Sequence, residues 1–320
     1  MKHNIFLLSI LFIFAISSCS EEDLPEVAVY YTYLYWTSMA DHQILRAVYQ
    51  DDVLLQTEVV YGSLKGLDTP TALVVDEPNQ MLYWTDFSTR QILRGAWDGS
   101  GNPEVLYTAP LRSYGPVELV MDTERLYWTQ PYDQLILSAP ANGLGPVDTL
   151  FDRSDGLNGP WGIDLEVSAG YLYWVEYEDN ELWRVSLTEN STTELIYAGG
   201  SGFLNPYGIA ISEGTGELFI TDNALPGAAY ADRILRGSLD GAMKLETVYD
   251  EEDGVSNAYA VVIDEWSGEL YWLNQLNAGS IYRGGVDGRA TEELIMDIAL
   301  GQGLCIVRST HEPNVLMQYK

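Results

Sequence analysis

Short apolar and aromatic runs recur along the chain, separated by turns rich in glycine, aspartate and asparagine. The clearest run is Leu-Tyr-Trp-Thr or a close variant of it. Its six copies begin at Leu34, Leu82, Leu126, Leu172, Leu218 and Leu270. Neighbouring copies lie 44 to 52 residues apart, a period typical of repeat architectures. The sequence therefore predicts six units of one kind.

Each unit contains four short runs with the composition of β-strands, rich in Tyr, Trp, Ile and Val. The first run ends in an acid or its substitute, and its copies are Ala72–Asp76, Glu118–Asp122, Gly162–Glu166, Gly208–Ser212 and Ala260–Asp264. The second run carries Leu-Tyr-Trp-Thr. The third comprises Ile44–Arg46, Ile92–Arg94, Ile136–Ser138, Leu182–Arg184, Ile234–Arg236 and Ile281–Arg283. The fourth is a run such as Glu104–Tyr107 or Glu194–Tyr197.

An Asp-Gly or Asn-Gly pair separates the third and fourth runs in four units. The pairs are Asp98-Gly99, Asn142-Gly143, Asp240-Gly241 and Asp287-Gly288. They predict tight type I′ hairpins, and therefore antiparallel four-stranded sheets. Because the strands lack a polar alternate face, each sheet needs cover on both sides. Six sheets packed in a ring meet this need, so the predicted fold is all-β, a six-bladed β-propeller with four-stranded antiparallel blades.

The two ends of the chain are predicted to close this ring. Only residues 27–31 precede the first aromatic run, so the first unit lacks its own innermost strand. A copy of that strand, Gly303–Val307, follows the sixth unit. A C-terminal strand that completes the first blade would leave no open sheet edge. Cys305 in this strand is expected to be a buried thiol, whereas Val315–Tyr319 resembles a surplus aromatic strand without an assigned place.

The repeated residues resemble the low-density-lipoprotein-receptor class B repeat, or YWTD family, whose modules are six-bladed β-propellers. The resemblance extends from about Tyr33 to Val307. The final acid of the motif is kept only at Asp86 and Asp222. No cysteine-rich growth-factor-like module stands beside the repeats, so the resemblance does not imply the receptor partners of the animal proteins.

The first residues have the pattern of an export signal, because Lys2 precedes the apolar run Ile5–Ile16. This run is shorter than the roughly 20 residues that span a membrane. Residues 16–19, Ile-Ser-Ser-Cys, resemble a bacterial lipobox, which implies a lipid on Cys19. We expect a lipoprotein signal peptide over residues 1–18, a lipidated acidic tether over 19–27 and a single propeller over 28–320. The expected location is the outer membrane, facing the periplasm or the cell exterior.

The net charge of the chain excludes some classes of binding partner. Asp and Glu number 47 against 16 Lys and Arg, a formal net charge of -31, which repels nucleic acids and anionic lipids. Membrane contact is therefore expected only through the lipid on Cys19, and the chain is expected to be a monomer. Three histidines and two cysteines are too few for a zinc finger, an iron–sulfur cluster or a disulfide framework. The acidic runs Asp250–Asp253 and Glu176–Asp179 are interpreted as solvated surface charge.

Candidate binding residues lie on one face of the predicted ring. Because strands alternate in direction, loops from the second to the third strand and from the fourth to the next first strand emerge together, on what we call the top face. Its aromatic residues are Trp161, Tyr207 and Tyr259 at the start of innermost strands, Phe87, Tyr132 and Tyr177 in the second-to-third loops, and nearby Tyr114. Tyrosine and tryptophan are enriched at recognition sites, although such rings also pack between blades. The predicted function is binding of a protein, peptide or glycan through this aromatic, acidic face.

The arginines of the third strands have two interpretations. They are Arg46, Arg94, Arg184, Arg236 and Arg283. A ring of anion-binding groups is one interpretation. The preferred one is structural, in which each arginine pairs with an acid of its own unit, such as Asp76 or Asp264, because a property repeated in every blade is usually architectural.

The leading alternative function is a calcium-dependent hydrolase or lactonase with its site in the central channel. Six-bladed lactonases resemble the predicted architecture and hold a channel metal with oxygen ligands. The residues that could supply such oxygens are Glu118, Asn205, Asp222, Asn223 and Asn274. No Asp-x-Asp-x-Asp-Gly loop occurs, and His42 and His311 do not form part of a recognisable triad. Binding without catalysis is preferred, no catalytic or metal-binding residue is assigned, and calcium stays open as a cofactor.

Overall fold

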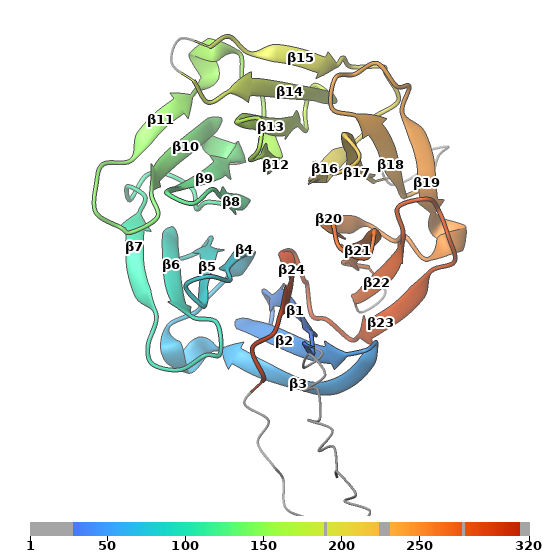
Figure 1. Ribbon diagram of the computed structural model, residues 1–320. Helices are drawn as coiled ribbons and strands as arrows, with labels where there is room; N and C mark the ends of the chain where they lie inside the picture. Colours follow the sequence, from blue (N-terminus) through green and yellow to red (C-terminus); the bar gives the residue numbers. More distant parts are fainter. Residues whose placement is uncertain (1–27, 189–190, 224–230, 277–278, 314–320) are drawn as a thin grey trace, which may run out of the picture.

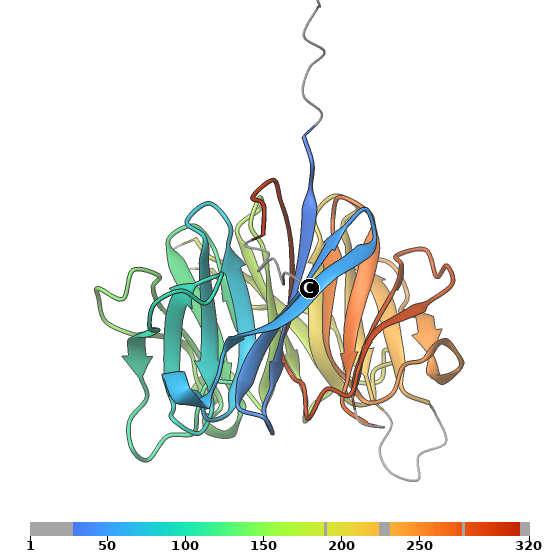
Figure 2. The same ribbon diagram turned by 90° about the horizontal axis from the view of Figure 1, so that it is seen from below.

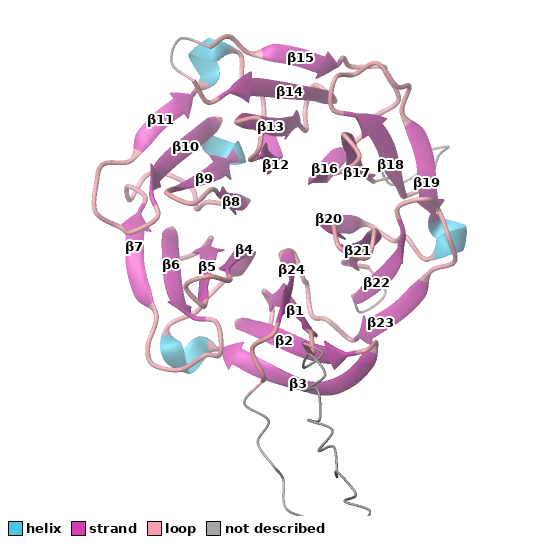
Figure 3. Cartoon of the chain, in the orientation of Figure 1, coloured by secondary structure: helices cyan, strands magenta, loops and turns pink. Residues whose placement is uncertain are grey.

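The structure, a computed structural model, describes residues 28–188, 191–223, 231–276 and 279–313. Within these ranges, 24 strands form six four-stranded antiparallel sheets that stand as blades around one axis (Figure 1, Figure 3). This confirms the predicted all-β, six-bladed β-propeller. The signal peptide, the acidic tether with Cys19, and Val315–Tyr319 lie outside the described residues. No helix in the described part of the chain is long and apolar enough to cross a membrane.

Each blade follows the same order from the axis outwards. Blade 1 comprises β24 (Leu304–Ser309), β1 (Tyr31–Ser38), β2 (Gln43–Gln50) and β3 (Val53–Tyr61). Blade 2 comprises β4 (Pro70–Asp76), β5 (Met81–Asp86), β6 (Gln91–Ala96) and β7 (Glu104–Thr108). Blade 3 comprises β8 (Leu119–Met121), β9 (Arg125–Gln130), β10 (Leu135–Pro140) and β11 (Asp148–Phe151).

The remaining blades repeat this arrangement. Blade 4 comprises β12 (Pro160–Glu166), β13 (Tyr171–Glu176), β14 (Glu181–Ser186) and β15 (Glu194–Tyr197). Blade 5 comprises β16 (Pro206–Ser212), β17 (Glu217–Asp222), β18 (Arg233–Ser238) and β19 (Glu246–Asp250). Blade 6 comprises β20 (Ala258–Asp264), β21 (Glu269–Asn274), β22 (Ser280–Gly285) and β23 (Glu292–Met296). Short 3-10 helices are η1 (Ser63–Lys65), η2 (Pro131–Asp133), η3 (Arg153–Asp155) and η4 (Glu251–Asp253).

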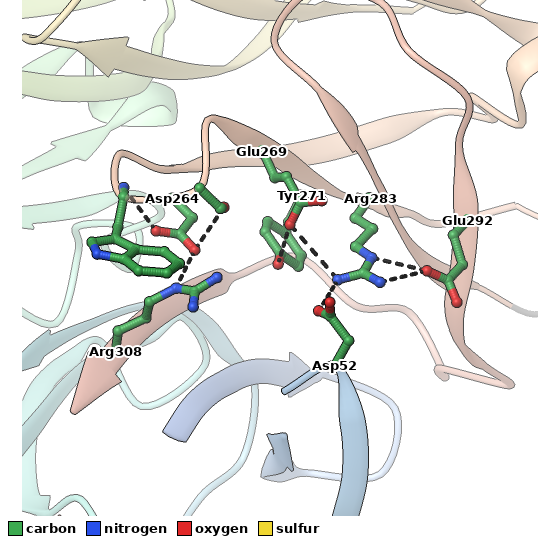
Figure 4. Close-up of polar contacts among 9 residues, drawn as sticks. Asp52, Asp264, Glu269, Tyr271, Arg283, Glu292 and Arg308 are labelled. Atoms are coloured by element: carbon green, nitrogen blue, oxygen red, sulfur yellow. Dashed lines mark hydrogen bonds and ion pairs between the residues drawn. The ribbon is translucent and has the colours of Figure 1, made fainter. Parts of the chain in front are cut away.

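The ring closes as predicted, because β24 pairs antiparallel with β1 and places Cys305 opposite Tyr35. Two arginine ion pairs join blade 6 to blade 1 at this junction (Figure 4). Arg308 of β24 lies 2.6 Å from Asp264, and Arg283 lies 2.6 Å from Asp52. Cys305 as a whole is only partly buried, less than predicted, since the innermost strand borders the channel. Desolvation nevertheless raises the pKa of its thiol to about 11.

The repeated tryptophan forms the centre of the packing between blades. Trp84, Trp174 and Trp272 are almost completely buried. Each stacks on an aromatic ring of the fourth strand of the preceding blade, with centroid distances of 4.9 to 5.3 Å. Both faces of each sheet were predicted to be covered, and these contacts show that neighbouring blades provide the cover.

The third-strand arginines pair with acids of their own units, as predicted, but not with the two acids given as examples, Asp76 and Asp264. Arg94 and Arg184 each pair with the glutamate directly opposite on the fourth strand, Glu104 or Glu194, at 2.9 and 2.8 Å. Their guanidinium groups also donate to backbone carbonyls of the next blade. The predicted partner Asp76 lies on the first strand, which is not adjacent to the third. Sheet geometry therefore selects the fourth-strand acid.

The predicted type I′ turns are also corrected. At the four Asp-Gly and Asn-Gly pairs, glycine alone has a positive φ, 76° at Gly99, and the amide of Gly99 donates to the carbonyl of Ala96. The preceding Asp98 instead accepts a hydrogen bond from the amide of Ser100. A two-residue loop with both φ values positive occurs at Asp51-Asp52, between β2 and β3. Glycine permits both turns, so the pair alone could not distinguish them.

The acid at the end of the second strand, which carries the Leu-Tyr-Trp-Thr run, accepts hydrogen bonds from the loop that precedes the first strand of the same blade. Asp86 is completely buried and accepts hydrogen bonds from the backbone amides of Asp68 and Thr69. Glu176 likewise accepts a hydrogen bond from the backbone amide of Asn158, and it also accepts one from the indole N–H of Trp174. Glu176 is thus buried, not solvated as predicted, and burial raises its pKa to about 7.

The other acidic run, Asp250–Asp253, is partly structural. Asp250 accepts a hydrogen bond from the amide of Glu252, and Asp253 accepts one from the amide of Asp250. These reciprocal bonds cap η4, so only part of the run is free surface charge.

Candidate functional site

The top face carries the loops that connect second to third strands and fourth to first strands. β1 runs towards this face and ends at Ser38. The described chain begins at the opposite, bottom face (Figure 2), where Ala28 lines a pocket with Asp51 and Asp52 of the loop between β2 and β3. The innermost strands start at the top face. Residues at the start of β12, β16 and β20 therefore surround the top of the central channel.

All seven predicted aromatic residues lie together, in what we call the aromatic arc. The ring contacts are Phe87–Tyr132 at 5.8 Å, Tyr114–Tyr132 at 5.2 Å, Tyr132–Trp161 at 6.0 Å, Trp161–Tyr177 at 5.8 Å, Trp161–Tyr207 at 5.3 Å, Tyr177–Tyr207 at 5.1 Å and Tyr207–Tyr259 at 4.5 Å. These distances are typical of favourable aromatic pairs. The arc is continuous from blade 2 to blade 6. That it binds a ligand stays a prediction.

Trp161 and Tyr207 are each followed by a glycine, and these two glycines allow the rings of neighbouring blades to come into contact. A Cβ on Gly162 would lie 2.1 Å from the carbonyl oxygen of Tyr207, and one on Gly208 would lie 2.5 Å from that of Tyr259. These glycines therefore allow neighbouring innermost strands to approach closely. The aromatic residue before each glycine consequently meets its equivalent in the next blade.

Exposure changes along the arc. Tyr132 is 55% exposed, whereas Tyr207 is only 9% exposed. Burial is the main cause that raises the pKa of Tyr207 well above its ordinary value, and the hydroxyls of Tyr177 and Tyr259 raise it further. The end of the arc at Tyr207 is therefore mainly packed inside the protein. The end at Tyr132 is exposed to solvent and offers a free aromatic surface.

Below the arc, the innermost strands enclose a central channel with a cavity of about 220 Å³. Tyr259 lines its upper part, so the channel continues from the aromatic arc. Most of the lining is aliphatic, from residues such as Leu73 and Val262. Two carboxylates, Glu118 and Asp164, interrupt this apolar surface.

Glu118 occupies a position that carries glycine or alanine in the other blades. Its amide donates to the motif threonine hydroxyl, as do those of Ala72, Gly208 and Gly303. Among the described residues, no group donates a hydrogen bond to its carboxylate. Burial, with a smaller effect from the negative charge of Asp164, raises the pKa of Glu118 to about 8.

Asp164 was not identified by sequence reasoning. Burial raises its pKa to about 7, even though its carboxylate accepts hydrogen bonds from the amides of Leu165 and Ile211. The bond to Ile211 links blade 4 to the innermost strand of blade 5. The sequence contains a sign that could have identified Asp164, because the other units carry a small or aliphatic residue at the equivalent position. These residues are Val74, Val120, Ala210, Val262 and Cys305.

The structure does not bring the five candidate oxygen ligands of a lactonase together in the channel. Glu118 is the member of that set that lines the cavity. Asp222 instead accepts from the backbone amides of Leu204 and Asn205, and Asn274 holds the loop before blade 6. In the described chain, no group of three or more His, Cys, Asp or Glu side chains is arranged to hold a metal ion.

No family model matches the chain. Among curated proteins, it is similar to the protein cueball of Aedes aegypti, with 27% identity over 179 residues, 52% of this chain and 26% of that protein. It is also similar to low-density lipoprotein receptor-related protein 5 of Homo sapiens, with 30% identity over 187 residues, 55% of this chain and 11% of that protein. The chain thus spans well under two thirds of the length of these relatives.

Solved structures show the same architecture. The nidogen/laminin complex contains a chain with a TM-score of 0.69 and 17% identity, matched over 86% of this chain and 98% of that one. A gluconolactonase from Xanthomonas campestris has a TM-score of 0.55 and 14% identity, over 75% and 78% of the two chains. Such identities establish a shared fold alone. The six Leu-Tyr-Trp-Thr repeats and the similarity to the lipoprotein-receptor-related proteins support a six-bladed β-propeller built from repeats of the LDL-receptor class B, or YWTD, type.

Proposed function

We propose that this protein is a lipid-anchored, extracytoplasmic module that binds a protein partner through the aromatic arc. The observation that carries the proposal is the continuity of the arc, because seven contacting rings form one surface rather than scattered packing contacts. Its more exposed members, Tyr114 and Tyr132, provide apolar area with polar tips, which suits protein recognition. Similarity to receptor-related proteins and to a chain of the nidogen/laminin complex supports a protein ligand over a peptide or glycan.

The place where the described chain begins supports an arc that faces away from the membrane. Ala28 lines a pocket with Asp51 and Asp52 at the bottom face, where the described chain begins (Figure 2), and a tether over residues 19–27 would lead from there to a lipid on Cys19. The arc would then point away from the outer membrane and stay accessible. The proposed location is therefore the surface of that membrane, with the propeller in the periplasm or outside the cell.

A channel hydrolase is the second candidate, supported by the gluconolactonase-like fold and by the two channel carboxylates. Calcium takes six to eight oxygen ligands. Glu118 and Asp164 supply at most four carboxylate oxygens, and Asp164 already accepts two backbone hydrogen bonds. Binding through the arc is therefore the preferred function.

The lipid anchor predicts the behaviour of Cys19→Ser. In the expressing bacterium, the unchanged chain should be recovered with the membranes and carry labelled fatty acid, whereas Cys19→Ser should be unlabelled and recovered in the soluble extracytoplasmic fraction. Cys305→Ser, the control, should behave as the unchanged chain because its thiol lies in a blade. Equal labelling of the Cys19→Ser variant would contradict the anchor.

The arc predicts the behaviour of Trp161→Ala combined with Tyr132→Ala. The soluble chain from Glu21 onwards is used to capture partners from the cell envelope and the surroundings, and the affinity for an identified partner is then measured. Loss of two central rings should weaken binding by roughly 100-fold or more. The control is Trp266→Ala, which removes a ring that is 76% exposed beside Arg308 near the bottom face, and which should bind as the unchanged chain does. Equal affinity for all three proteins would exclude the arc as the binding surface.

A further inference from the structure

Five of the six junctions between blades are filled by one apolar side chain from the loop that leads to the next blade. It stands three residues before the position of Pro70, the first residue of β4, or before the equivalent position of another blade, which is Pro160, Pro206, Ala258 or Gly301. These junction residues are Leu67, Leu157, Phe203, Val255 and Ile298, and all are buried. Each belongs to the core cluster of its junction. The repeat therefore assigns this position to packing.

The junction between blades 2 and 3 departs from this rule. The equivalent position, three residues before Pro116, carries Ser113. The only leucine of this loop, Leu111, is 88% exposed and does not replace the missing side chain. The core cluster of this junction accordingly includes no member of residues 109–118, all of which are described.

The consequence is a pocket of about 380 Å³, within the size range of small-molecule sites. Ser113 lines it, together with apolar side chains that include Tyr107, Trp128 and Leu137. The rings of Tyr107 and Trp128 are 6.1 Å apart, whereas the equivalent pairs at three other junctions are 4.9 to 5.3 Å apart. The missing side chain has therefore left an apolar space with an aromatic wall.

A cation without a partner lines the same pocket. Arg90, in the loop between β5 and β6, contributes to the lining, and its Nε atom is buried without a hydrogen-bond partner. Among the described residues, Arg90 forms no ion pair and no side-chain hydrogen bond. Arg112, Arg153 and Lys244 also form no ion pair among the described residues, but their side chains are exposed to solvent, whereas Arg90 is only partly exposed and has a buried Nε atom. An unpaired, partly desolvated guanidinium favours an anionic partner.

We propose that this pocket, which we call the junction pocket, binds a small organic anion with an apolar body and a single carboxylate or sulfonate group. The apolar body, an aromatic ring or a short acyl chain, would pack against Trp128 and Tyr107. The anionic group would pair with Arg90, and the hydroxyl of Ser113 provides a further hydrogen-bond donor. This site is separate from the proposed protein-binding role of the arc, although Gln130 of the pocket donates to the carbonyl of Tyr114 at 2.7 Å.

Fluorescence titration with anilinonaphthalene sulfonate, an aromatic anion, tests the proposal. The unchanged protein should bind one equivalent, and octanoate should displace the probe more effectively than octanol. Ser113→Leu restores the side chain found at another junction, so it should abolish the signal and raise Tm by at least about 2 °C through better packing. Arg90→Gln should weaken probe binding about 10-fold or more, because the apolar walls stay while the charge pairing is lost.

Two controls keep the outcome clear. Arg112→Gln removes an equal charge from the same loop region without altering the pocket lining, so it should bind the probe as the unchanged protein does. The arc variant Trp161→Ala with Tyr132→Ala should also keep probe binding. Undiminished binding by folded Ser113→Leu would overturn the proposal, as would equal losses in Arg90→Gln and Arg112→Gln. If Ser113→Leu fails to fold, Ser113→Val and Arg90→Gln supply the same comparison.

Discussion

A chain that stops after Gly303 is expected to lose its folded structure altogether. This truncation removes β24, the innermost strand of blade 1, and leaves the inner edge of β1 without its hydrogen-bond partner. It also removes Leu304 from the core cluster shared by blades 1 and 6, and the ion pair between Arg308 and Asp264. An opened ring exposes the apolar faces of two blades at once.

The expected loss exceeds the roughly 5–15 kcal/mol that stabilises a typical folded domain. Far-ultraviolet circular dichroism and urea denaturation should show no cooperative transition for this truncated chain. A chain that stops after Pro313 is the matched control, because it keeps all of β24. It should unfold at the same urea concentration as the full chain. A cooperative transition of normal midpoint after removal of β24 would disprove the closure mechanism.

Glu118→Gln is expected to remove a large pH dependence of stability. The folded protein raises the pKa of this carboxyl to about 8, whereas an unfolded glutamate titrates near 4.3. Between these values the folded state holds a proton that the unfolded state has lost, so stability falls as pH rises. Glutamine is neutral at every pH. The variant should therefore match the unchanged chain near pH 4 and be more stable near pH 9.

The difference at pH 9 should be about 2–3 kcal/mol, less than the full pKa difference implies, because the Glu118 side chain is only partly buried and solvent screens its charge. The measurement is the free energy of unfolding in urea from pH 4 to pH 9. Some slope should persist, since Asp164 and Glu176 also have raised pKa values. Glu178→Gln, on an exposed top-face loop, is the control and should keep the slope of the unchanged chain. Equal slopes for Glu118→Gln and the unchanged chain would show that the folded protein does not raise the pKa of Glu118.

The strand order and the ring closure could be predicted because they follow from repetition. Six copies of one pattern define their own alignment, and the missing strand of the first unit matches the surplus copy that contains Cys305. The aromatic arc could be predicted for the same reason. Equivalent positions such as Trp161, Tyr207 and Tyr259 must lie at equivalent places around the axis.

Local details were predicted less well, because one residue type suits several geometries. Asp98-Gly99 fits a type I′ turn and the turn that the structure contains equally well. The pairing of third-strand arginines with fourth-strand acids depends on strand adjacency. Residue types alone left Asp76 as plausible a partner as Glu104.

The amino-acid sequence by itself determined the number of blades, their strand order and the residues that form the top face, because these depend on periodicity. Only the tertiary structure decided what the exceptions to the repeat do. Glu118, Asp164 and Ser113 are visible in the sequence as departures from their equivalents. Whether a departure leads to a charged channel or to an open pocket depends on which neighbouring blade the side chain faces. That information exists only once distant strands are packed together.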